Sequence, residues 1–61
     1  MDGKFTGTSL YEVGLALRAR GEFFEARRVL RDALKLVPEH PHARAALADV
    51  EHAIRVRSRT S

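Results

Sequence analysis

The chain has 61 residues, no cysteine and a formal net charge of +3. This length allows one small domain, and the lack of cysteine excludes disulfides, thiolate metal sites and cysteine catalysis. Because a chain of about 60 residues buries only roughly 60% of the surface that its unfolded form exposes, folds of this size usually need a disulfide, a metal or a partner to stabilise them.

The excess positive charge lies at the C-terminal end. Residues 1–54 carry equal numbers of basic and acidic side chains, whereas the last seven residues add three arginines and no acid. A basic body that would attract nucleic acid is therefore not predicted. The longest uncharged apolar stretch, residues 13–17, is far shorter than the ~20 residues of a membrane span, and residues 1–9 lack the apolar core of a signal peptide. We expect a cytoplasmic protein without a membrane span.

The N-terminal part predicts a flexible lead followed by a helix. Residues 1–8 contain two glycines and no hydrophobic periodicity, so they form the expected lead. Ser9 and Glu12 have the spacing of a capping box ahead of an apolar run, which predicts a first helix over about 9–20. Gly21 ends this helix, because glycine tolerates the left-handed backbone conformation of a helix exit.

A second helix is predicted from Glu22 to the residue before Pro38. Acids at positions 22 and 25 suit the positive end of the helix dipole, and proline cannot continue the helical hydrogen bonds. Apolar residues recur at spacings of three and four, which indicates a core-facing side. They are Phe23, Ala26, Val29, Leu30, Ala33, Leu34 and Val37.

Pro41 suits the first turn of a third helix, predicted to run to about residue 56. Its apolar side is Ala43, Ala46, Leu47, Val50, Ala53 and Ile54. Residues 57–61 are expected to be a frayed basic tail. The sequence thus predicts an all-α domain over residues 9–56, an antiparallel helical hairpin plus a third helix.

This pattern resembles the tetratricopeptide repeat (TPR), a helix–turn–helix unit of about 34 residues with the consensus W-x2-L-G-x2-Y, A-x3-F and P. Gly14, Ala26 and Pro38 are identical to the consensus, and apolar residues replace the other positions. Those positions are Leu10, Val13, Leu17 and Leu30. The resemblance covers about residues 7–40, and the third helix would begin a following repeat or cap the first one.

The resemblance implies a non-enzymatic protein–protein interaction module without a cofactor. In this family an inner groove is lined largely by the first helix of each repeat, so the predicted partner-binding residues are Tyr11, Leu15, Arg18 and Ala19. The alternative is that these residues are simply part of the chain's own core. The Lys, Asn and Arg clamp with which some members hold a C-terminal carboxylate is missing, so that mode of binding is not predicted.

The first helix also predicts self-association. It is apolar on nearly all sides, with only Glu12 and Arg18 charged between Leu10 and Ala19, and such a helix is usually buried all round. The other two helices can cover about two of its sides, and repeat arrays generally need about three repeats. We therefore expect another copy of the chain, or a larger complex, to cover the third side, with Tyr11 and Leu15 at the interface.

Other candidate chemistry is weak. No nucleophile–base pair or glycine-rich phosphate loop is present, so no catalytic residue is predicted. His42 and His52 would be roughly 15 Å apart along one helix, which argues against a shared metal ion, and the histidines are interpreted as solvated. The cluster Arg27, Arg28 and Arg31 is interpreted as a solvated side, with an available ion pair between Asp32 and Arg28.

One alternative function uses the tail. Arg55, Arg57 and Arg59 could contact phosphates, which would make the chain a small nucleic-acid-associated protein. No aromatic residue lies near these arginines to stack on bases, so the protein-interaction hypothesis is preferred. Salt dependence separates the two, because binding to phosphates weakens steeply with salt.

Overall fold

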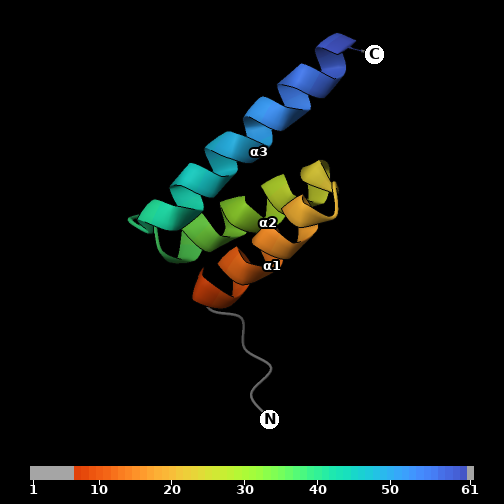
Figure 1. The fold of residues 1–61 in the computed structure, drawn as a ribbon. Helices are drawn as coiled ribbons and strands as arrows, with labels where there is room; N and C mark the ends of the chain where they lie inside the picture. Colours follow the sequence, from red (N-terminus) through yellow and green to blue (C-terminus); the bar gives the residue numbers. More distant parts are fainter. Residues whose placement is uncertain (1–6, 61) are drawn as a thin grey trace.

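The computed structural model describes residues 7–60, which form three helices (Figure 1). These are α1 (Gly7–Ala19), α2 (Phe23–Leu36) and α3 (Pro41–Thr60). No strand occurs among the described residues, which confirms the predicted all-α class. Of the expected flexible lead, residues 1–6 lie outside the described part, and Gly7 and Thr8 begin α1.

Two helix ends differ from the prediction. Because α1 begins at Gly7, Ser9 is its third residue and cannot be the N-cap of the predicted capping box. At the other end, α3 continues through Thr60, so residues 57–60 are helical where fraying was expected. The physical reason is that this stretch contains no glycine or proline, and Arg57 and Arg59 suit the negative end of the helix dipole.

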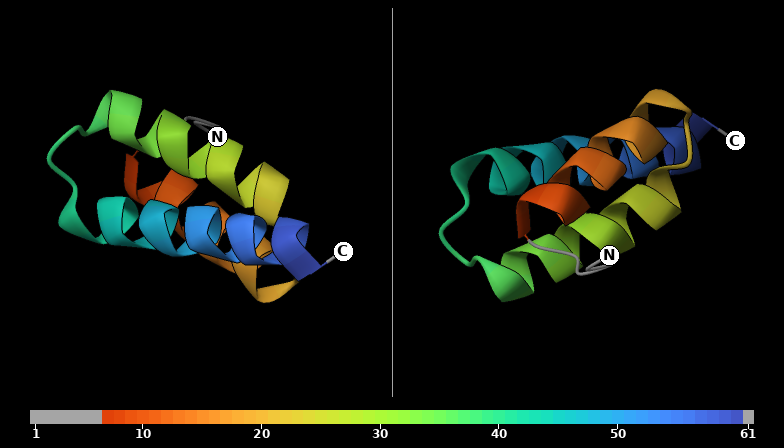
Figure 2. Two further views of the ribbon diagram at one scale, coloured as in Figure 1. Left: turned by 90° about the horizontal axis from the view of Figure 1, so that it is seen from above. Right: turned by 90° about the horizontal axis from the view of Figure 1, so that it is seen from below.

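The three helices pack as an antiparallel hairpin with a third helix beside it. The chain reverses direction between α1 and α2 and again between α2 and α3, so α3 runs parallel to α1 (Figure 1). The views from above and from below show that α1 packs against both α2 and α3 (Figure 2). This arrangement brings the start of α3 next to α1, which is where the candidate site forms.

Two glycines allow the hairpin to close. Gly21 has a φ of +81°, the left-handed conformation predicted for the exit of the first helix. Gly14 is buried in α1, and a Cβ atom added there would lie 2.7 Å from Cγ and Cδ2 of Leu30 on α2. The missing side chain therefore lets α1 approach α2 closely, as the family pattern implies.

The turn into α3 is defined by two prolines and a histidine. Helix α2 ends at Leu36, two residues before Pro38, because proline cannot donate the next helical hydrogen bond. Pro41 is the first residue of α3, where its missing N–H has no helical partner to lose. The Ala43 N–H donates to Nδ1 of His40 at 3.0 Å, so His40 acts as the N-cap of α3.

The core is small and rich in alanine. Its buried hydrophobic residues come from α2 and α3 and belong to the two predicted apolar sides. They are Ala26, Leu30, Ala33, Ala43, Ala46 and Val50. Several large hydrophobic side chains are instead 40% or more exposed. They are Val13, Phe24, Leu36, Val37 and Val56. Among the described residues, Leu30 and Val50 are the large side chains with complete burial, so much of the apolar side-chain surface stays open.

Candidate protein-binding surface

Side chains of α1 contact α3 and the histidine that precedes it. The ring centroid of Tyr11 lies 4.9 Å from that of His40 and 6.2 Å from that of His42. Seven residues further along both helices, Nη1 of Arg18 lies 3.5 Å from Oδ2 of Asp49. The equal spacing of the pairs Tyr11–His42 and Arg18–Asp49 shows that the two helices run side by side in the same direction. We call this region, with Leu15, the α1–α3 surface.

The side chains of the predicted partner-binding residues Tyr11 and Leu15 are partly buried in the core and partly exposed to solvent. Both are half-buried and pack against the buried cluster that contains Leu30 and Val50. Part of each side chain is therefore used within the chain, and part remains open to another molecule. A substitution at either position will affect folding as well as any contact with a partner.

Arg18 and Ala19 lie at the C-terminal end of the same helix. The Arg18 side chain is 38% exposed, and its charge is partly compensated by Asp49. Exposed ion pairs of this kind contribute about 0–1 kcal/mol, so this contact orients the side chains more than it stabilises the fold. Ala19 is exposed.

The histidines at the start of α3 are candidate-site residues that sequence reasoning missed. His40 was interpreted as a solvated turn residue, but it is half-buried, caps α3 and contacts the ring of Tyr11. The signal was available in Pro41, because proline is favoured at the first helical position and so marks the preceding residue as the cap. His42 is exposed, as predicted, and its ring still lies close to Tyr11.

One side of α1 faces away from α2 and α3. Val13 is 40% exposed, and Ala16 and Ala19 are also exposed. We call these three residues the open side of α1; the exposed Glu12 is the acidic residue beside them. These exposures agree with the expectation that the other two helices cover only part of this helix.

The three arginines near the C-terminus lie on the last turns of α3 and are exposed. Arg57 also contacts the hairpin: its Nη1 lies 3.5 Å from the carbonyl oxygen of Gly21, and its Cζ lies 5.7 Å from the ring centroid of Phe23. Arg57 therefore joins the end of α3 to the turn between α1 and α2. This contact gives one of the tail arginines a role within the fold.

A family model described as tetratricopeptide repeat matches residues 8–50. The chain belongs to the TPR family. The match starts in α1, includes all of α2 and ends within α3, so it covers the hairpin and the α1–α3 surface. TPR repeats generally mediate protein–protein interaction, and the family is typically non-enzymatic.

Searches of curated proteins and of solved structures returned no match to this TPR chain. Within residues 7–60, none of the helices combines the length and the apolar character that crossing a membrane requires. The family and the surface geometry are therefore the basis for the proposed function.

Proposed function

We propose that this TPR chain is a non-enzymatic protein–protein interaction module that self-associates, or docks into a larger complex, through α1. The observation that carries the proposal is the distribution of apolar surface. Four of the six buried hydrophobic residues are alanines, while Val13 on α1 and four other large hydrophobic side chains are 40% or more exposed. Burial of such surface contributes about 25 cal/mol per Å2, so a partner that covers it stabilises the fold.

A second copy of the chain is the simplest partner. In repeat arrays each unit buries its open sides against its neighbours, and the repeat model matches once here, over residues 8–50. Two copies related by a two-fold axis would bring the same side of α1 together and bury Val13 twice. The α1–α3 surface lies at the edge of this contact, where Arg18 and Asp49 would set the orientation of the partner.

Charged substitutions on α1 test the proposal. Ala19→Arg introduces a long cation on the open side without removing a core contact, because Ala19 is exposed. Leu15→Glu is the stronger change, but it also affects the core. Light scattering coupled to size exclusion should show a lower molar mass for both variants than for the unchanged chain at the same concentration.

The matched control is Ala48→Arg, which makes the same chemical change at an exposed position of α3. Position 48 lies three residues before Glu51, which pairs with Arg31 of α2. It is therefore on the side of α3 that meets α2 and not on the side that meets α1. The control should keep the mass of the unchanged chain. If Ala19→Arg also keeps that mass while circular dichroism shows it folded, the open side of α1 is not the interface.

A further inference from the structure

One side of α2 carries a row of cations that the α1 interface does not use. Arg27, Arg28, Arg31 and Lys35 follow Phe24 at distances of three, four, seven and eleven residues, so the five residues lie along one side of the helix. Together with Asp32 they line a hollow of about 560 Å3. We call these five residues the cationic α2 side.

Two of these cations have acidic neighbours and two do not. Arg31 lies 3.4 Å from Glu51, and Lys35 lies 3.9 Å from Asp32. The predicted pair between Asp32 and Arg28 is therefore replaced by a pair with Lys35. Within residues 7–60, Arg27 and Arg28 have no carboxylate partner, so this side of α2 has an excess of positive charge at its centre.

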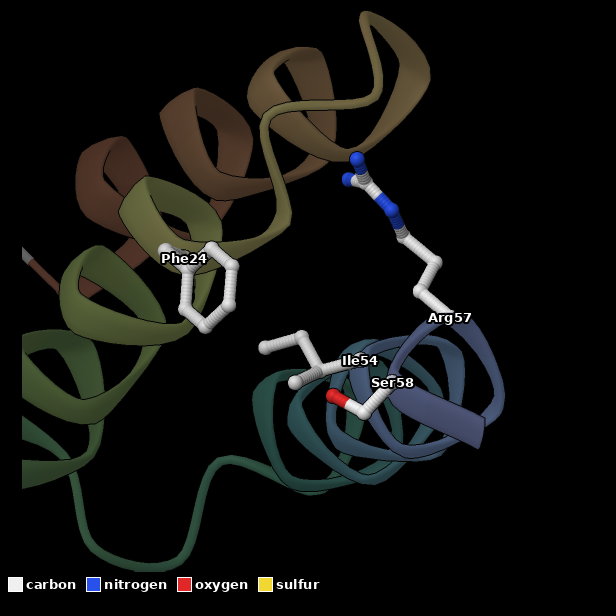
Figure 3. Close-up of a pocket in the computed structure, with 4 residues that line it drawn as sticks. All are labelled: Phe24, Ile54, Arg57 and Ser58. Carbon is white, nitrogen blue, oxygen red and sulfur yellow. The ribbon is translucent and has the colours of Figure 1, made fainter. Parts of the chain in front are cut away.

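An aromatic side chain and a pocket lie at one end of the row. Phe24 is 59% exposed, the most open of the large hydrophobic residues described, and Cζ of Arg27 lies 5.4 Å from its ring centroid. Phe24 faces Ile54 and Ser58 across the space between α2 and α3 (Figure 3). With Arg57, these residues line a pocket of about 200 Å3.

The size and lining of this pocket fit one apolar side chain. Small-molecule sites usually have about 300–1,000 Å3, so the pocket is too small for a typical ligand of that kind. Its wall is formed by Phe24 and Ile54, and the Arg57 side chain extends from its edge toward the turn between α1 and α2 (Figure 3). An apolar residue bound there would place the residues that follow it in the partner next to Arg27 and Arg28.

We propose that the cationic α2 side binds an acidic peptide segment of a partner protein, with one apolar residue of that segment in the pocket beside Phe24. From position 24 to position 35 the helix rises about 16 Å, which about five residues of an extended peptide cover. Carboxylates in the segment would accept paired hydrogen bonds from the guanidinium groups of Arg27 and Arg28. This surface is on α2, so the proposal does not depend on association through α1.

The same features favour a peptide over a nucleic acid. Proteins that bind single strands combine cations with several aromatic side chains on which successive bases stack. The cationic α2 side has one aromatic residue, and that residue adjoins an apolar pocket instead of a second stacking ring. A charged segment with a single apolar anchor matches this arrangement better than a row of bases does.

Fluorescence anisotropy with labelled synthetic peptides tests the proposal on the full chain. The probe has one leucine followed by four glutamates, and a second peptide replaces the leucine with alanine. We expect the leucine peptide to bind, Arg28→Glu to weaken this binding by about tenfold, and the alanine peptide to bind several-fold more weakly. Arg20→Glu, in the turn after α1, makes the same change in net charge away from the row and should leave binding within about twofold.

Three results would overturn the proposal. The first is an equal loss of binding in Arg28→Glu and Arg20→Glu, which would indicate a response to net charge alone. The second is a leucine peptide that binds no better than the alanine peptide. The third is a thymidine oligonucleotide that binds as tightly as the leucine peptide. Ala19→Arg should retain peptide binding, so a failure of association through α1 is distinguishable from a failure of this site.

Discussion

At the scale of single residues, Gly14 of α1 and Leu30 of α2 approach each other closely. Leu30 is fully buried, and its Cγ lies where the first atom of any side chain at position 14 would meet it. The identity of Gly14 with the TPR consensus thus has a local cause. Gly21 differs, because a Cβ there would meet nothing within 4 Å and its positive φ alone favours glycine.

Gly14→Ala tests this close approach. Alanine improves helix propensity by about 1 kcal/mol, but overpacking a buried contact costs about 1–3 kcal/mol. Because Cγ of Leu30 is near the backbone and buried, the cost should exceed the gain, and urea unfolding should show a net loss of up to about 2 kcal/mol.

The background Leu30→Ala supplies the control for this prediction. It removes the atoms that the new Cβ would meet, so in that background Gly14→Ala should stabilise the chain or leave its stability unchanged. A Gly14→Ala variant that is more stable than the unchanged chain would contradict a tight contact between α1 and α2. Stabilities should be compared at one protein concentration, because association shifts the apparent value.

At the scale of the helices, the sequence predicted the helix ends accurately where a glycine or a proline interrupts the helix. Gly21, Pro38 and Pro41 fixed the two turns, because a positive φ or a missing N–H leaves the backbone few choices. The start of α1 and the end of α3 have no such residue, and their predictions differ from the structure by two and four residues. The hydrophobic spacing identified the buried sides of α2 and α3.

The candidate site was predictable only in part. The family pattern placed Tyr11, Leu15 and Arg18 on one side of the first helix, and the structure places all three toward α3 or the core. Their contact partners, His40 at the N-cap of α3 and Asp49 within α3, depend on how α3 crosses α1. Spacing within one helix contains no information about that crossing, so their roles could not be found from the sequence.

His40 gives a prediction for the start of α3. His40→Ala removes the acceptor for the Ala43 N–H and the ring that contacts Tyr11, and we expect a loss of about 1–2 kcal/mol in the free energy of unfolding. His40→Asp restores a capping acceptor without the ring, so it should recover part of the loss. Urea unfolding followed by circular dichroism measures both values.

The control for this prediction is His52→Ala, at an exposed position of α3. It should change stability by less than about 0.5 kcal/mol, as surface substitutions usually do. If His40→Asp is as unstable as His40→Ala, the hydrogen bond to the Ala43 N–H does not contribute to stability. The contact with Tyr11 would then account for the whole effect of His40.

At the scale of the whole molecule, the chain is a single TPR hairpin followed by one further helix. Its core contains two large, fully buried side chains, and no disulfide reinforces it. The stabilising feature that a chain of this size needs is, in our account, another protein surface against α1. Stability and association should therefore be coupled, so that both increase with protein concentration.

The molar mass of the purified chain is the most direct test of self-association. Sedimentation equilibrium over a range of micromolar concentrations, combined with thermal unfolding at the same concentrations, measures association and stability together. We predict a mass above the 6.8 kDa of one chain and an unfolding temperature that rises with concentration. A folded chain that stays at 6.8 kDa at high micromolar concentration, with an unfolding temperature independent of concentration, would contradict self-association.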